Sequence, residues 1–294
     1  MKIGFFGDGP WSHLALEKLL FDSSLEVMFI CARFDNPDKS LEKTALKIKV
    51  PFLIHSDVNS ELFIDGITQF DCDLFVSMSF NQIFGKKIRT VPKVGIINCH
   101  AGKLPFYRGR NILNWALIND EKEFGITVHF VDDGIDTGDI ILQRVFPIVD
   151  EDNYETLLDR SYLGCSEILY EAIKKIQSGS FEIIKQNSID PIGSYFSRRL
   201  PGDEVIDWNQ DSREIFNFVR ALTLPGPLAL TRYGNNLVRV SHAVPVYEMR
   251  PYKDIPGSII GKPNGLIRVK TKNTAVDIVT TTASNEFRIG YRLT

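Results

Sequence analysis

Cysteine is scarce in this chain, and the four that occur stand far apart. Cys31, Cys72, Cys99 and Cys165 show none of the close spacings that hold a zinc ion or form a redox-active pair. The sequence therefore predicts no metal site and no disulfide framework. Reduced thiols of this kind are typical of a protein that works in the cytoplasm.

Long apolar runs and a strong excess of one charge are also missing. No stretch is long enough to cross a membrane, and the first residues enter a strand pattern directly, which predicts no signal peptide. The net charge of −3 argues against a general nucleic-acid binder. From Val205 onward, however, there are 12 basic and 7 acidic residues, so this part could meet phosphates or be an ordinary solvated surface.

The first half of the sequence contains a regular alternation of strand and helix signals. Short apolar runs alternate with stretches of helical period, and Pro10 suits a helix start. The strands are expected at 2–7, 25–32, 52–55 and 74–79, and the helices after residue 10, near 40–48, near 58–69 and over 153–179. This alternation predicts an α/β fold, with a Rossmann-like, mostly parallel sheet and helices on both of its faces.

The pattern changes after residue 188. Residues 189–204 contain prolines, glycines and a pair of arginines, and are predicted to be a linker or an active-site loop. A helix is expected over 212–224, followed by short β-rich runs at 237–240, 258–260, 266–271, 275–281 and 287–289. Such runs are typical of a small OB-like barrel or sandwich. The predicted domains are therefore 1–188 and 205–294, joined by the linker.

One region carries the strongest chemical signal. Strand patterns cover 94–98 and 125–131, and side chains two apart on a strand point the same way, so Asn98 and His100 are expected to project together. The second strand runs into a glycine-punctuated loop that carries Asp136. Because α/β folds place their chemistry on such loops, the amide, the imidazole and the carboxylate predict an acyl-transfer site.

Three other features of the sequence are explained by structure rather than by catalysis or cofactor binding. Cys99 is expected to point to the opposite face of the strand as a core thiol. His129 alternates away from its apolar neighbours and is predicted to be a structural histidine near the site. Gly7-Asp8-Gly9 lacks the third glycine of a dinucleotide fingerprint, and a tight strand-to-helix turn explains it better. A Rossmann-type nucleotide-binding dehydrogenase or sensor is therefore a weaker alternative.

Taken together, these motifs resemble the formyltransferase family that uses 10-formyltetrahydrofolate. The shared marks, in order and at family-like spacing, are Asn98-x-His100, Leu104-Pro105-x-Tyr107-Arg108-Gly109 and Asp136-Thr137-Gly138-Asp139-Ile140. Weaker similarity covers nearly the whole chain. It includes Ile206-Asp207-Trp208 and Pro225-Gly226-Pro227, which resemble the start of the C-terminal domain in two-domain members. The resemblance implies an N-formyltransferase with 10-formyltetrahydrofolate as co-substrate.

Within that family the chain looks most like the sugar N-formyltransferases, which act on a UDP- or dTDP-linked amino deoxysugar such as a 4-amino-4,6-dideoxy sugar. After His100 it reads Ala-Gly-Lys103-Leu-Pro, where tRNA-modifying relatives usually read Ser-Leu-Leu-Pro, and residues 34–39 lack the long basic insertion of those relatives. The helix that starts at Asn111 resembles that of aminoarabinose-formylating enzymes. The implied setting is surface polysaccharide biosynthesis, with a pseudaminic-acid-type pathway as the nearest resemblance. Methionyl-tRNA formylation is the alternative.

The resemblance also implies roles for individual residues. The catalytic trio of the family matches Asn98, His100 and Asp136. In this trio His100 would move the proton, and Asp136 would orient the His100 ring. The walls of the pterin pocket match Asn81, Gln82, Ile83, Phe84, Val131, Asp132, Asp133 and Gly134. Substrate contacts are implied for Lys103, Tyr107, Arg108, Arg110, Asn111, Arg198 and Arg199. Tyr107-Arg108 also suits a structural turn, and Arg198-Arg199 a solvated pair.

The implied partner is a nucleotide-linked amino sugar rather than a nucleic acid or a membrane. A homodimer is compatible with the resemblance, although no residue pattern points to one. The nucleotide, the sugar and the ring position of its amine stay open, because they depend on loop geometry that spacing does not reveal.

Overall fold

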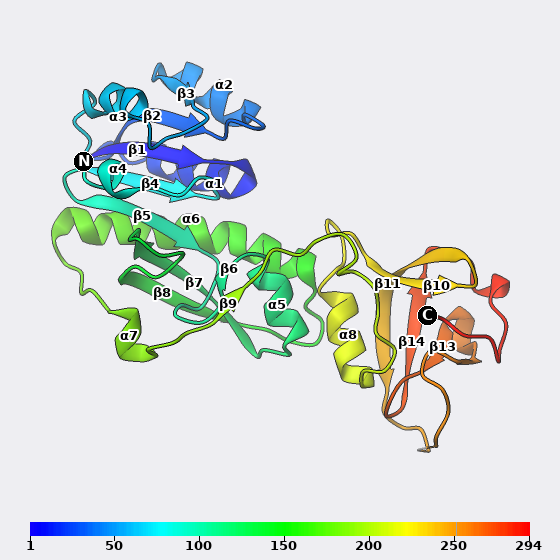
Figure 1. Ribbon diagram of the computed structural model, residues 1–294. Coiled ribbons are helices and arrows are strands. Elements are labelled where there is room, and N and C mark those ends of the chain that lie inside the picture. The colour runs from blue at the N-terminus through cyan, green and yellow to red at the C-terminus, as the bar shows by residue number, and fades with distance from the viewer. Residues whose placement is uncertain (251) are drawn as a thin grey trace. The chain divides into compact units, whose positions relative to one another are not determined.

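The computed structural model describes residues 1–250 and 252–294 and divides into two compact units. The first unit contains Met1–Gly109, Phe124–Phe146 and Asp159–Tyr195. The second contains Arg110–Glu123, Pro147–Leu158 and Phe196–Thr294. The compact units therefore interleave along the chain, as the colours of Figure 1 show. The division into domains 1–188 and 205–294 stays a prediction.

The first unit is built on a seven-stranded sheet in the order β3-β2-β1-β4-β5-β7-β8. Strands β1 to β5 pair in parallel, and β7 pairs antiparallel with β5. The bounds are β1 (Lys2–Gly7), β2 (Glu26–Ala32), β3 (Phe52–Ile54), β4 (Leu74–Met78), β5 (Gly95–His100), β7 (Glu123–Phe130) and β8 (Ile140–Pro147). The predicted mostly parallel, Rossmann-like sheet is confirmed.

Helices cover both faces of this sheet. They are α1 (Gly9–Leu20), α2 (Lys39–Ile48), α3 (Glu61–Thr68), α4 (Lys86–Arg89), α6 (Tyr154–Ser178) and α7 (Gln186–Ile189). Pro10 lies in the first turn of α1, and Asp38 caps α2 by accepting hydrogen bonds from two backbone amides. On one face, α3 and α4 bury Phe63 and Ile88 against an aromatic cluster that includes Phe6.

Strand β5 separates two environments. Ile96 belongs to the aromatic cluster, and Asn98 and His100 alternate onto the same face. Cys99 points the other way, where its thiol donates a hydrogen bond to the Cys165 carbonyl of α6 at 3.7 Å. The structure thus confirms that Asn98 and His100 share a face and that Cys99 is a core thiol.

The second unit contains a five-stranded antiparallel sheet that forms a half-barrel. Its strands are β10 (Ala229–Tyr233), β11 (Asn236–Val246), β12 (Ile259–Gly261), β13 (Ile267–Lys270) and β14 (Ala275–Thr280), and its helices are α5 (Ile112–Ile118) and α8 (Ser212–Arg220). Short pieces complete the chain: β6 (Arg108–Gly109), β9 (Tyr195–Phe196), and 3₁₀ turns at Pro263–Gly265 and Ser284–Glu286. Among the described residues, no helix combines the length and apolarity needed to span a bilayer.

The structure differs from the sequence-based expectation at several elements, and two of the differences have a clear physical reason. The strand predicted at 287–289 is wrong: Phe287 is buried in the core of the second unit, but it follows a 3₁₀ turn and needs no strand pairing to be covered. Strand β8 was not predicted. Its second half is largely exposed at the edge of the sheet, so its alternation is weak and its start merges with the glycine-rich loop before it.

A charged cluster on α8 ties separate segments of the second unit together. The Arg213 guanidinium bonds to the carboxylates of Asp120 and Asp150, each at a shortest distance of 2.6 Å. Partial burial by itself would raise the pKa of Asp120, but the hydrogen bonds from Arg213 and Lys122 outweigh it and lower that pKa to about 2. The cluster therefore needs an ionised Asp120.

Removing Arg213 should cost little stability but change its pH dependence. We expect Arg213→Ala to lower unfolding free energy by about 1 kcal/mol or less, because partly exposed ion pairs contribute no more. Asp120 has a folded pKa below its unfolded value, so its contribution is present at neutral pH and is lost as the pH falls from about 4 to about 2. Denaturant midpoints should fall less steeply with acid in Arg213→Ala than in the wild type. Identical acid profiles would contradict this.

Candidate active site

His100 ends strand β5, and its ring is held from both sides. Its Nε2 lies 2.7 Å from the Tyr107 carbonyl. Because a carbonyl can only accept, this nitrogen carries a hydrogen, and any further proton must enter or leave at Nδ1. Tyr107 has a φ of 59°, an uncommon backbone conformation for a bulky residue, which turns its carbonyl toward the ring.

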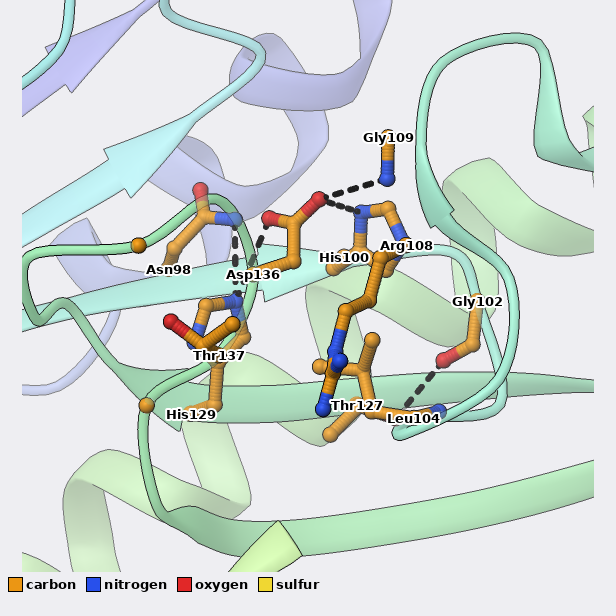
Figure 2. A network of polar contacts seen from close by, with 12 residues as sticks. Asn98, His100, Gly102, Leu104, Arg108, Gly109, Thr127, His129, Asp136 and Thr137 are labelled. Carbon is orange, nitrogen blue, oxygen red and sulfur yellow. Dashed lines mark hydrogen bonds and ion pairs between the residues drawn. The ribbon is translucent and has the colours of Figure 1, made fainter. Parts of the chain in front are cut away.

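Asp136 lies between two histidines, as Figure 2 shows. Its Oδ2 is 3.6 Å from His100 Nδ1 and accepts a hydrogen bond from the Gly109 amide at 2.9 Å. Its Oδ1 is 3.6 Å from His129 Nε2. Burial alone would raise the pKa of Asp136, but the two histidines and the Gly109 amide outweigh it and hold that pKa well below its usual range. The carboxylate is therefore ionised at working pH.

His129 joins Asn98 to this network. The two residues are paired across the antiparallel strands β5 and β7, and the Asn98 Nδ2 lies 3.3 Å from His129 Nε2. The Nδ1 of His129 donates to the Phe130 carbonyl at 2.7 Å, which fixes the ring. The sequence predicted a structural histidine near the site and missed that His129 contacts both Asn98 and Asp136. The alternation of side chains along β7 predicts the face of the sheet on which His129 lies. Its position opposite Asn98 follows only from the register in which β5 and β7 pair.

The loop after β5 is fixed by buried polar contacts. Thr127 donates to the Gly102 carbonyl at 2.7 Å, and the Gln143 amide donates to Thr127 and to the Leu104 carbonyl, both at 2.8 Å. Gly102 itself has no room for a side chain, since a Cβ there would lie 2.5 Å from both His100 Nε2 and the Tyr107 carbonyl. The glycine thus permits the contact that anchors His100.

Filling the space at Gly102 should impair turnover. In Gly102→Ala, the methyl group must push the His100 ring or the Tyr107 carbonyl away, and we expect kcat to fall by about 10- to 100-fold, as small misplacements of catalytic groups do. Gly66→Ala is the matched control, because a Cβ at this α3 position meets nothing within 4 Å. Equal kcat values for the two variants would show that the close approach at Gly102 is unimportant.

The Arg108 side chain makes its hydrogen bonds within the protein. It is buried, its Nε and Nη2 donate to the Gln186 side-chain oxygen at 3.0 and 2.7 Å, and its Nη1 donates to the Ile192 carbonyl at 3.1 Å. These contacts fit the structural role that the sequence left as the alternative, and the substrate contact of Arg108 stays a prediction.

The two segments predicted to wall a pterin pocket follow strands β4 and β7. The Gln82 side chain bonds to the Val58 amide and the His55 carbonyl, and Phe84 packs in the aromatic cluster, so these side chains serve the fold. Within residues 1–250 and 252–294, the backbone N–H groups of 81–84 donate to no protein acceptor. Backbone N–H groups without a protein acceptor suit a flat heterocycle whose ring atoms accept hydrogen bonds. This segment therefore fits the pterin ring that the resemblance implies.

The second of these segments, residues 131–134, lies in a loop fixed by hydrogen bonds and an ion pair. Asp132 accepts hydrogen bonds from the Gly134 amide at 3.1 Å and from the Thr137 hydroxyl at 2.5 Å, while Asp133 pairs with Arg89 of α4. Gly138 closes the loop so tightly that a Cβ there would lie 1.7 Å from the Phe130 carbonyl. These contacts fix the backbone that leads into Asp136.

The remaining predicted substrate residues are distributed over both units. Lys103 lies in the first unit beside Gly125, whereas Arg110, Asn111, Arg198 and Arg199 belong to the second. The Arg199 guanidinium packs over the rings of Trp115 and Phe218, and burial lowers its pKa. The substrate contacts of these residues stay predictions. In the part of the chain that the structure describes, no cluster of His, Cys, Asp and Glu could hold a metal ion.

The fold and the site define the class of protein. A Rossmann-like sheet whose edge gathers an imidazole, an ionised carboxylate and an amide is typical of an acyl-transfer enzyme. The formyl transferase family matches residues 1–173, and the C-terminal domain of formyl transferases matches residues 201–288. The chain belongs to the formyl transferase family. It is an N-formyltransferase.

Curated relatives of two kinds are similar to the chain. The bifunctional polymyxin resistance protein ArnA of Wigglesworthia glossinidia brevipalpis is 32% identical over 237 residues, which are 81% of this chain but only 36% of that protein. The chain thus spans about a third of that relative. A methionyl-tRNA formyltransferase of Thermodesulfovibrio yellowstonii is 30% identical over 280 residues, covering 90% of this chain and 88% of the relative.

Solved structures support the fold. WlaRD, a sugar 3N-formyl transferase crystallised with dTDP and 5-N-formyl-THF, has a TM-score of 0.70 and 22% identity over 96% of this chain and 98% of its own. An N-formyltransferase from Helicobacter canadensis, in complex with folinic acid and dTDP-3-aminofucose, has a TM-score of 0.69 and 22% identity over 95% and 98% of the two chains. At this identity the likeness concerns the fold.

Proposed function

We propose that the protein transfers the formyl group of 10-formyltetrahydrofolate to the amine of a UDP- or dTDP-linked amino deoxysugar. The observation that carries the choice of substrate is the connection between β2 and α2. Residues 33–38 form it in six positions and bring Arg33 together with two carboxylates, Asp35 and Asp38. Arg33 is itself neutralised by bonds to Asp8 and Asp35. A short, acidic connection at the carboxyl edge of the sheet disfavours the phosphate backbone of a tRNA.

The polar groups of the site suit the proton movements of formyl transfer. The amine must lose a proton as its bond to the formyl carbon forms, and the nitrogen that the formyl group leaves must gain one. Because the Tyr107 carbonyl occupies Nε2 of His100, Nδ1 is the atom that exchanges the proton. Ionised Asp136 stabilises the imidazolium that results.

Asn98 supplies a donor for the oxygen that gains charge. One N–H of its amide points to His129 Nε2, and the second is directed away from that ring. His129 thereby fixes the plane of the amide, and the second N–H can bond the formyl oxygen as negative charge develops on it. Losing one such donor typically costs about 10²–10³ in turnover.

Methionyl-tRNA formylation is the second candidate. Several curated methionyl-tRNA formyltransferases are 30% identical or more over most of this chain, and the C-terminal residues carry an excess of basic side chains. The chemistry at His100 and Asp136 would be the same. Only the acceptor and its binding surface distinguish the two functions.

An acceptor panel separates the candidates. Purified protein with 10-formyltetrahydrofolate is offered UDP- and dTDP-linked amino sugars, with amines at different ring positions. Unformylated initiator methionyl-tRNA is offered in a parallel arm. We expect a formylated sugar product, detected by its added mass, and no formylated methionyl-tRNA. Formylation of initiator methionyl-tRNA, with an affinity that falls steeply with salt and without any sugar product, would replace the proposal with the second candidate.

A further inference from the structure

The segment between the two matched family regions reaches into the active site. The matches cover residues 1–173 and 201–288, so residues 174–200 lie outside both. Residues 186–194 of this segment belong to the first compact unit and contact the two loops that carry the catalytic groups. We call residues 186–194 the strap. The sequence placed most of it in a linker or active-site loop.

Gln186 at the start of the strap is buried, and its amide is fully used. Its Nε2 donates to the backbone carbonyls of Asp136 at 2.8 Å and of Gly138 at 2.7 Å. Its Oε1 accepts two hydrogen bonds from Arg108. This orientation of the amide is fixed, because turning it over would set its N–H groups against a guanidinium and its oxygen against two carbonyls.

The other end of the strap holds the loop that anchors His100. The Ser194 hydroxyl accepts from the Tyr107 amide at 3.0 Å, and the Ser194 carbonyl accepts from the Arg108 amide at 3.0 Å. Gly193 lies so close that a Cβ there would be 2.4 Å from the Pro105 carbonyl. The strap therefore sets the Tyr107 carbonyl, which holds His100, and the Gly109 amide, which holds Asp136.

Asp136 needs such support because its backbone is in an uncommon conformation. Its φ is 54°, in the left-handed region. Among the described residues, its carboxylate is held by the Gly109 amide and by two histidines at 3.6 Å. We propose that Gln186 is a positioning residue, which holds the Asp136 backbone so that the carboxylate meets Nδ1 of His100. Through Arg108 it couples the two catalytic loops to each other.

This inference rests on the catalytic roles proposed for His100 and Asp136, so its test includes a measurement that needs no acceptor. Two variants separate positioning from folding. Gln186→Met removes all four hydrogen bonds at similar volume. Gln186→Glu keeps the acceptor for Arg108 and removes the donors to Asp136 and Gly138. The matched control is Asn217→Leu, because Asn217 is an equally buried amide that accepts from Arg220 at 3.0 Å within the second unit.

We expect kcat to fall by about 10- to 100-fold in both Gln186 variants, with KM for the formyl donor changed less than about threefold. In an Asp136→Asn background, Gln186→Met should cost no more than about twofold further, because its target is already lost. Asn217→Leu should keep the wild-type kcat. Wild-type kcat in folded Gln186→Glu, a full additional loss in the Asp136→Asn background, or an equal loss in Asn217→Leu would overturn the inference.

The NMR signals of the His100 ring, recorded at one fixed pH, provide the independent measurement. Loosening Asp136 should shift these ring signals in Gln186→Met relative to the wild type, because the carboxylate that faces Nδ1 of His100 is displaced. Unchanged His100 signals in the folded variant would overturn the inference. If no acceptor in the panel is formylated, the proposed function fails, while these spectra still decide the positioning role.

Discussion

Asp136→Asn should lower kcat by about 10³-fold while the protein stays folded, since replacing an orienting carboxylate by its amide typically costs about 10³–10⁴. The substitution conserves shape, and the Gly109 amide can still donate to the remaining side-chain oxygen. What disappears is the negative charge that faces His100 and His129. Steady-state kinetics with 10-formyltetrahydrofolate and the accepted substrate measure the effect.

The low pKa of Asp136 makes this prediction specific. The carboxylate is ionised well below neutral pH, so it cannot cause a fall in wild-type activity between about pH 5 and 7. Any acid-side loss in that range therefore belongs to another group than Asp136. Turnover close to the wild-type rate in this variant would show that the carboxylate has no part in catalysis.

The second large effect is expected for His100→Ala. Among the described residues, two imidazoles lie beside Asp136 and Asn98. Both ring nitrogens of His129 are engaged, by the Asn98 amide and the Phe130 carbonyl, which leaves Nδ1 of His100 to exchange the proton. Loss of a proton-transfer group typically costs about 10²–10⁴ in rate, and we expect a fall of about 10³-fold in kcat.

A neighbour on the same strand supplies the control. Cys99→Ala alters the adjacent side chain, which points to the opposite face of β5 toward α6. It should lower stability slightly and leave kcat within about twofold of the wild type, because only the packing of a small core thiol changes. If Cys99→Ala impaired kcat as strongly as His100→Ala, general damage to β5 would explain both.

The local sequence pattern was enough to predict the mostly parallel sheet and the common face on which Asn98 and His100 lie. Apolar runs give strands, and the two-residue period gives the face on which a side chain lies. The same reasoning correctly placed Cys99 on the other face. The glycine-punctuated loop after the second strand pointed to Asp136, which lies 36 positions after His100 in the sequence and 3.6 Å from it in the structure.

What the sequence did not reveal depends on long-range register and on loop contacts. His129 contacts Asn98 because β5 and β7 pair antiparallel with these residues opposite one another, and alternation along one strand cannot give that register. For Arg108 the sequence left a substrate contact and a structural turn open. Its side chain is buried against Gln186, 78 positions later in the sequence. This contact follows only from the packing of the strap against the loop that contains Arg108.

The double-mutant cycle between His100 and Asp136 tests the central claim most directly, because residues that act as one unit have strongly non-additive effects. The claim is that these side chains cooperate at one edge of the sheet to move a formyl group onto an amine. We predict that the double variant His100→Ala/Asp136→Asn is slower than the slower single variant by no more than about threefold. Independent effects, which would multiply to a loss of about 10⁶, would contradict the account.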